Sequence, residues 1–200
     1  MLIVEGILST LRANGTAHLA AMGARLVDGS FNRFVLRPFF DTQSYQNLTN
    51  QREGVFHVTD DVLLIARLVV GHCPECCFYP PRRVRAPILA DACRAFEFQV
   101  VTLDSADELR ASVTCRTLHC WNMRPFLGFN RARHALLELA ITATRLHLLP
   151  KDNVLDELRR AELLTQKTGG ELEQETLRVL RDHVLRFYEN PPLEEPLPPG

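Results

Sequence analysis

The chain has 200 residues, of which 46% are hydrophobic and 24% charged, and its formal net charge is −1. These values are typical of a globular domain that buries its own core without help from a metal or a disulfide. The near-neutral charge argues against a general nucleic-acid-binding protein, which needs a basic face to neutralise phosphates. No apolar run reaches membrane-spanning length, and the first residues lack the basic region of a signal peptide. We therefore expect a cytoplasmic protein whose six cysteines are reduced thiols.

The first half of the chain is predicted to consist mainly of antiparallel strands. Apolar and polar residues alternate with period two in several short runs, and Asn14-Gly15 and Asp28-Gly29 are hairpin turn signals. Short strands joined by tight turns favour a closed or partly closed barrel. The predicted strands cover residues 3–11, 16–27, 31–39, 54–59, 94–103 and 109–121.

Two short helices are predicted between these strands, and a helical region follows them. The apolar spacing from residue 129 onward is helical, and Gly169-Gly170 separates the last two helices. The expected fold is mainly β with α: a six-stranded antiparallel β-barrel with a C-terminal helical appendage. The predicted parts are a barrel over 1–125, a helical region over 126–189 and a Pro-rich, disordered or extended tail over 190–200. The predicted helices cover residues 42–50, 61–70, 129–149, 151–166 and 171–189.

The connection after the third predicted strand carries a group of side chains that can hold an anion. A helix that begins near Thr42 presents unpaired amides and the positive end of its dipole. Arg37, Tyr45 and Asn47 add a guanidinium, a phenol and an amide, which together suit a phosphate monoester. The alternative is that Asp41 or Thr42 only caps the helix. The residue pattern by itself leaves both interpretations open.

A second candidate is the run Ala21-Met22-Gly23 in the second predicted strand. Small residues leave the backbone accessible to a flat ligand, and glycine in a strand otherwise only lowers stability. A β-bulge or a close helix crossing explains the same pattern equally well.

Three other patterns are given structural interpretations. Cys73-x-x-Cys76 lacks the second cysteine pair that a zinc site usually has, so residues 71–91 are expected to form an inert loop without a metal. Asp60-Asp61 precedes a helix and is interpreted as its N-cap and first-turn acid. Arg131, at the start of the long helix, is either a solvated turn residue or part of a basic wall for an anion.

Several of these motifs occur in an order that resembles the FMN-binding split-barrel proteins. They are "AAMGA", "RPFFDTQSYQNL", "VFHVTDD", "GFNRARHALLELAITATRLHLLP" and "KTGGELE", and the resemblance covers residues 3–189. It is strongest to an uncharacterised branch catalogued as domain of unknown function 447, which is related in fold to flavin reductases.

The resemblance implies a split β-barrel homodimer with FMN in a groove between the subunits. It implies that Thr42, Tyr45 and Asn47 flank the phosphate, and that the backbone of residues 21–23 lies against the isoalloxazine ring. Two departures from the pattern are His57 in place of asparagine and Ala21 in place of proline; His57 can still form a hydrogen bond to the cofactor.

The resemblance also implies an FMN-dependent oxidoreductase of unknown substrate, with a nicotinamide as a plausible reductant. Arg131 is the preferred basic residue, with Arg37 on the phosphate side. The alternatives are a non-enzymatic module that binds FMN or another phosphorylated ligand, and a structural homologue that has lost the flavin. No nucleic-acid or membrane partner is expected.

Overall fold

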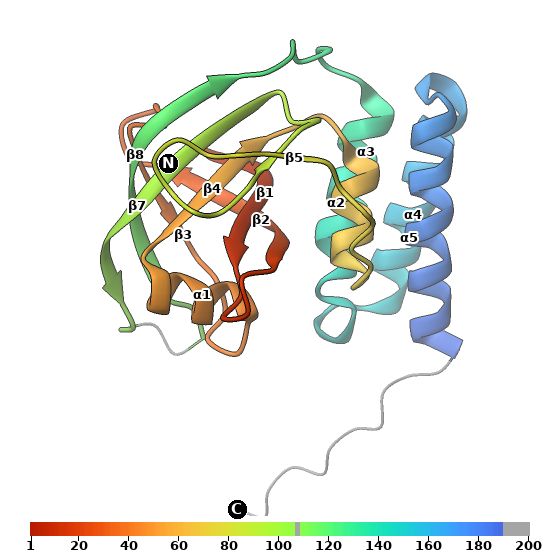
Figure 1. Ribbon diagram of the computed structural model, residues 1–200. Coiled ribbons are helices and arrows are strands. Elements are labelled where there is room, and N and C mark those ends of the chain that lie inside the picture. The colour runs from red at the N-terminus through yellow and green to blue at the C-terminus, as the bar shows by residue number, and fades with distance from the viewer. Residues whose placement is uncertain (107–108, 190–200) are drawn as a thin grey trace, which may run out of the picture.

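The computed structural model describes residues 1–106 and 109–189, and it consists of a β-barrel beside a layer of helices (Figure 1). The predicted tail over 190–200 lies outside the described residues. Six antiparallel strands close in the order β1-β2-β3-β8-β7-β4, which confirms the predicted six-stranded barrel. These strands are β1 (Ile3–Leu11), β2 (Ala17–Leu26), β3 (Arg33–Leu36), β4 (Glu53–Val58), β7 (Arg94–Asp104) and β8 (Ser112–Asn122).

Both predicted hairpin turns are present. Gly15 and Gly29 have φ angles of 81° and 76°, a backbone region that glycine enters without steric cost. The β1–β2 hairpin pairs in an unbroken register from Ile3 opposite Arg25 to Leu11 opposite Ala17. This regular ladder fixes which residues of the two strands face each other, and two candidate sites below depend on it.

The helices agree with the prediction except for the third, which is shorter. The predicted helix over 129–149 ends at Ala143 and is followed by a 3-10 turn at Leu146–Leu148. Leu148, in this turn, is 69% exposed. The helices are α1 (Gln43–Gln51), α2 (Val62–Val69), α3 (Arg131–Ala143), α4 (Lys151–Thr168) and α5 (Glu171–Glu189).

The interior of the barrel is filled with side chains. Phe34, Phe56 and Phe98 are each 0% exposed at its centre, and Phe31 stacks on Phe96 with 4.1 Å between ring centroids. A barrel of this size encloses side chains rather than a channel. Any ligand of this protein must therefore bind outside the barrel wall or at its rim.

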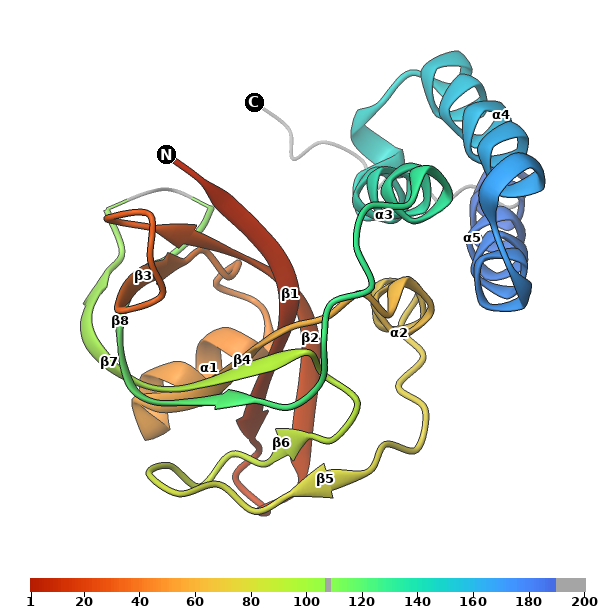
Figure 2. The ribbon, with the colours of Figure 1, turned by 90° about the horizontal axis from the view of Figure 1, so that it is seen from above.

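A second apolar core lies between the outer face of β1 and β2 and the helices. Ile7 and Leu19 point outward and pack in one cluster with α2 and α3 residues such as Ile65 and Leu136. Figure 2 shows α2 between the barrel and α5, with α3 beside β1. The helical layer therefore includes α2, which comes from the barrel half of the sequence, as well as the C-terminal region.

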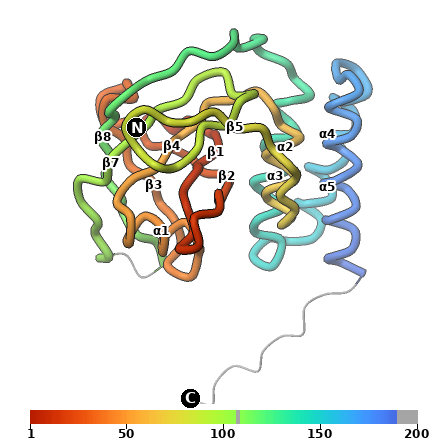
Figure 3. The backbone as a smooth tube through the Cα atoms, viewed as in Figure 1, coloured from red at the N-terminus to blue at the C-terminus, as the bar shows by residue number. Residues whose placement is uncertain are grey.

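A buried ion cluster joins the barrel to this layer. The segment after β8 crosses to α3 over one end of the molecule (Figure 3), and there Arg124 and Arg133 both pair with Asp60. Arg133 also pairs with Glu173 of α5. Burial opposes ionisation of Asp60, but hydrogen bonds from Arg124 and the Leu127 amide outweigh it and lower its pKa to about 2. Asp61 rather than Asp60 is the N-cap of α2, which starts one residue later than predicted and has no acid in its first turn, and Asp60 belongs to this cluster.

The loop over 71–91 is more ordered than predicted, because it contains the two-stranded sheet of β5 (Phe78–Tyr79) and β6 (Ile88–Leu89). The carboxylate of Glu97, on the outer face of β7, accepts hydrogen bonds from the amides of Arg82, Arg83 and Val84. The loop is therefore attached to the barrel wall through its backbone.

His57 provides the second attachment. It is 0% exposed, its Nδ1 donates to the Ile7 carbonyl (3.0 Å), and its Nε2 accepts from the Leu89 amide (2.9 Å). Burial lowers its pKa to about 4, so the ring is neutral near pH 7. His57 thus links β1, β4 and β6.

Replacing His57 with leucine should lower the free energy of unfolding by about 2–4 kcal/mol at pH 7, because a buried amide loses its acceptor. The folded-state pKa lies below the unfolded value, so the unfolded chain binds more protons and the wild type loses stability as the pH falls from 6.5 toward 4. The difference between variant and wild type should therefore shrink by about 2 kcal/mol between pH 7 and pH 5.

Urea unfolding at both pH values measures this difference. His147→Leu, at an exposed histidine, is the matched control and should match the wild type. A His57→Leu deficit of equal size at pH 7 and pH 5 would contradict the account of a neutral, buried His57.

Candidate functional site

The first turn of α1 is capped and still has backbone amides without a hydrogen-bond acceptor. Thr42 is the N-cap: its hydroxyl accepts from the Tyr45 amide and donates to the Phe39 carbonyl. The structure therefore confirms that Thr42 caps the helix, which is one of the predicted alternatives. Among the described residues, the amides of Gln43 and Ser44 have no acceptor, so they remain available to an anion beside the positive end of the helix dipole.

Two residues of the β1–β2 hairpin, Arg12 and His18, form a chain of contacts to this turn, and the sequence analysis did not single them out. Arg12 Nη2 lies 3.1 Å from Nδ1 of His18, and His18 Nε2 lies 3.2 Å from Oγ of Ser44. Because a guanidinium only donates, Nδ1 is the acceptor and Nε2 carries the proton that it donates to Ser44. The Ser44 hydroxyl proton is then left to donate elsewhere.

The charge state of His18 agrees with this direction. Burial, and then the neighbouring Arg12, lower the pKa of His18, which keeps the ring neutral with one donor and one acceptor nitrogen. The register of the hairpin brings these residues to α1, since Thr10 pairs with His18 and Leu11 with Ala17. Neither residue belongs to a local sequence motif, so no sequence signal indicates them.

The other predicted phosphate residues occupy different environments. Asn47 is 3% exposed and joins the helix to the barrel, with Nδ2 donating to Thr10 and Oδ1 accepting from Gln43. The Tyr45 ring makes an edge-to-face contact with Phe40. The Tyr45 hydroxyl has no hydrogen-bond partner among the described residues. Arg37 is half-buried directly after β3.

The predicted ring-binding run of residues 21–23 lies on β2. Its side chains point alternately to the outer face of the strand and to the barrel interior. Ala21 packs partly against the outer apolar core, whereas Met22 packs against the barrel interior. Gly23 faces outward like Ala21, and Glu5 lies opposite it on β1. Ala21 is three residues along the strand from His18, about 10 Å away at the usual rise, and the two side chains point to opposite faces of β2. The outer surface of this run is thus formed by Ala21 and Gly23, with the side chains of Glu5 and Ile3 over Gly23.

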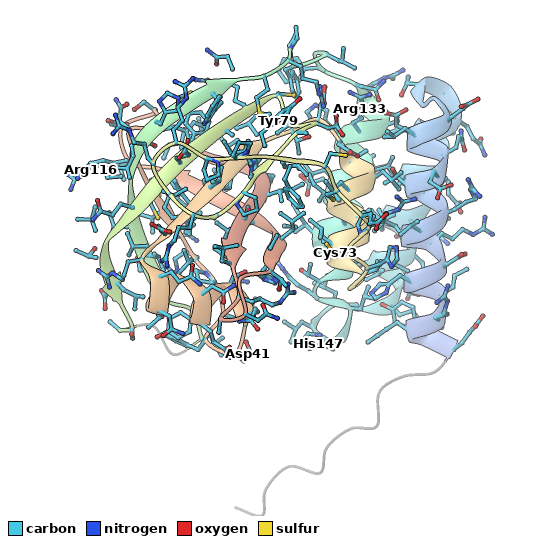
Figure 4. All side chains as sticks on the ribbon, in the orientation of Figure 1. Asp41, Cys73, Tyr79, Arg116, Arg133 and His147 are labelled. Carbon is cyan, nitrogen blue, oxygen red and sulfur yellow. The ribbon has the colours of Figure 1, made fainter. Side chains whose placement is uncertain are left out.

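Two predicted residues are not part of this group. His57 has both ring nitrogens engaged by the protein, so it has no donor or acceptor left for a cofactor. Arg131 is exposed at the first turn of α3, next to Arg133, and Figure 4 shows Arg133 and Asp41 at opposite ends of the molecule. Within one chain Arg131 therefore does not join α1.

Two cavities in the described part of the chain are lined by residues other than those of α1 and of the run 21–23. One, of about 460 Å³, lies between Cys93, Arg94 and Arg124 near the end of the barrel. The other, of about 710 Å³, lies between α3 and α4 and includes Arg131 and Phe129. At the first turn of α1, Gln43 is half-buried and Ser44 is 2% exposed.

The described residues contain no group of three or more histidine, cysteine or acidic side chains that could hold a metal ion. Cys73 and Cys77 of the 71–91 loop are exposed and Cys76 is half-buried, all as free thiols. No helix in the described part of the chain is long and apolar enough to cross a membrane.

The fold matches solved structures of FMN proteins. The FMN-bound protein MM1853 of Methanosarcina mazei aligns over 90% of this chain and 94% of its own, with 22% identity and a TM-score of 0.76. An FMN-binding protein of Thermus thermophilus aligns over 60% of this chain and 70% of its own, with 11% identity and a TM-score of 0.51. The NADH:FAD oxidoreductase SgcE6 of Streptomyces globisporus covers 60% and 71%, with 10% identity and a TM-score of 0.52.

No curated protein matches the chain significantly by sequence. The family profiles do match: residues 4–121 match the N-terminal domain of the protein family of unknown function DUF447, and residues 130–182 match the second profile of that family. The M. mazei structure carries the same family assignment. Together the two matches span most of the chain, and the protein belongs to the DUF447 family.

Proposed function

We propose that this protein binds FMN, with the phosphate at the first turn of α1 and the isoalloxazine ring on the outer face of β2. The observation that carries the proposal is the set of donors at α1. That turn carries two amides without an acceptor, the positive end of the helix dipole and the buried Ser44 hydroxyl, and Arg12 contacts it through His18. This donor set suits a phosphate monoester and has no carboxylate among its hydrogen-bonded members.

His18 and Ala21 are three residues, about 10 Å, apart on β2, and their side chains point to opposite faces of the strand, so the phosphate and the ring would lie on two sides of the hairpin. A ribityl chain separates the two groups in FMN. Ala21 presents a small side chain to a ring, and the Glu5 carboxylate lies over Gly23 beside it. The solved structure of a DUF447 protein contains FMN, which supports this choice among phosphorylated ligands.

FMN, when bound, supplies hydride and electron transfer chemistry, and the polypeptide supplies binding and orientation. We propose a flavin-dependent oxidoreductase with a nicotinamide as electron donor, on the model of the NADH:FAD oxidoreductase that shares the fold. The residues near β2 would hold and orient the ring, and the donors at α1 would anchor the phosphate. A non-enzymatic FMN-binding protein needs the same anchor and differs only in turnover.

We also propose that the protein is a homodimer with the flavin at the subunit interface. Arg133, on the same helix turn as Arg131, lies at the opposite end of the molecule from Asp41 (Figure 4), so a partner subunit would have to bring Arg131 to the phosphate. The segment before it is apolar and exposed: Phe126 is 51% exposed, Leu127 74% and Phe129 92%. Exposed apolar side chains in a row are typical of a protein contact surface.

Removing the Ser44 hydroxyl should weaken FMN binding about tenfold or more, since a hydrogen bond to a charged phosphate is worth about 1.5–3 kcal/mol. Arg12→Gln should weaken it similarly. Riboflavin, which lacks the phosphate, should bind the wild type and both variants equally weakly. Quenching of flavin fluorescence during a titration measures all these affinities.

The matched control is Thr49→Ala, at an exposed hydroxyl on the same helix, which should bind FMN like the wild type. Equal affinity of the wild-type protein for FMN and riboflavin would overturn the phosphate assignment. Oxidation of NADH or NADPH by the FMN-loaded protein then separates the oxidoreductase from the non-enzymatic binding protein.

A further inference from the structure

Glu5 of β1 and Gly23 of β2 are directly opposite each other in the hairpin register. Gly23 has no side chain, and the Glu5 carboxylate lies over the vacant position. A Cβ atom built on Gly23 would lie 3.0 Å from Oε1 and 3.1 Å from Oε2 of Glu5. Glu5 therefore occupies the outer surface at the end of the Ala21–Gly23 run, where the flavin ring is proposed to lie.

The Glu5 carboxyl group is half-buried and unpartnered. No hydrogen-bond donor or ion-pair partner contacts it among the described residues. The buried carboxylates of Asp60, Glu97 and Glu173 differ, because each accepts hydrogen bonds from amides or cationic side chains. A carboxyl group that is withdrawn from water without such donors favours its protonated form.

The charges around Glu5 act in opposite directions. Burial raises the pKa of Glu5, Glu138 of α3 raises it further, and Arg145 after α3 lowers it, with a net increase. Arg25 shares the outer face of β2 two residues beyond Gly23. The helices lie on the β1 side of the barrel (Figures 1 and 2), so Glu138 and Arg145 face Glu5 from the helical layer.

We propose that Glu5 contacts the isoalloxazine ring and that FMN binding transfers one proton from solvent to its carboxyl group. This inference rests on the proposed function. A flat ring against Gly23 must touch the carboxyl group that lies there and must remove its remaining water. The ring offers several oxygen and nitrogen acceptors but only one N–H donor, so a protonated carboxyl group has more partners than an ionised one. No bond of the flavin changes in this step.

The direction of the pH effect follows from the linkage between proton and ligand. Bound FMN raises the pKa of Glu5 above its value in the free protein, so affinity falls as the pH rises through the interval between the two values. The limit is about tenfold in Kd for each pH unit. Glutamine at position 5 is a permanently neutral donor of similar size, so Glu5→Gln should keep the affinity seen at low pH and lose this dependence.

Isothermal titration calorimetry of FMN into the full-length protein tests the inference. At one pH, two phosphate-free buffers with different ionisation enthalpies report the number of protons taken up. We expect uptake of up to one proton by the wild type and none by Glu5→Gln. Glu138→Gln should move the pH profile of Kd to lower pH, because it removes a charge that favours protonation. Glu75→Gln, on an exposed loop, should behave like the wild type.

The possible results separate the two proposals. Equal proton uptake and equal pH profiles for the wild type and Glu5→Gln would overturn the role of Glu5 while leaving FMN binding intact. Failure of the wild type to bind FMN at any pH would overturn the proposed function and this inference with it. Melting temperatures of the variants, measured without FMN, identify any that are not folded.

Discussion

The hydrogen bonds between α1 and the β1–β2 hairpin are the constraint on which the proposed site depends. Asn47 donates to Thr10, and His18 donates to Ser44, so two links tie one helix to adjacent strands. These links fix the first turn of α1 relative to β2. The same strand then carries Ala21 and Gly23, which places the anion donors and the small-residue surface on one rigid unit, as a preorganised ligand site requires.

The filled barrel determines where that site can lie. Its interior is occupied by phenylalanines, and most of the outer face of β1 and β2 is covered by helices. What remains for a ligand is the α1 end of the hairpin and the outer surface near Gly23 and Glu5. The buried cluster of Asp60, Arg124 and Arg133 holds the helical layer against the barrel. It thereby positions Glu138 near Glu5, so a network far from α1 still affects the charge of the proposed ring site.

The sequence was sufficient to predict most of the fold, because its signals were local. Period-two alternation, Asn14-Gly15 and Asp28-Gly29 predicted strands and turns that are present. The end of α3 at Ala143 was missed because apolar residues continue at helical spacing through Leu148 while the backbone turns at Thr144. The strands β5 and β6 were missed because two residues each carry no periodicity, and their attachment to Glu97 is a long-range contact.

The site was predictable only in part, for the same reason. The anion-binding character of the α1 turn could be inferred from its residue types, and Thr42 proved to be a cap, one of the two alternatives. Arg12 and His18 could not be inferred, since only the register of the hairpin brings them to Ser44. The environment of His57 depends on Leu89, 32 residues away in the chain. Its sequence position suggested a cofactor contact, whereas its burial makes it a structural link.

The measurement that tests the central claim most directly is an amide NMR comparison of the protein with FMN and with riboflavin. Phosphate at the first turn of α1 should shift the amide signals of Gln43 and Ser44 in the FMN spectrum only. Both ligands should shift Ala21 and Gly23. Shifts of Gln43 and Ser44 with FMN alone would confirm that the α1 turn holds the phosphate. Unchanged α1 amides in the presence of bound FMN would contradict the account and would require the phosphate to bind elsewhere.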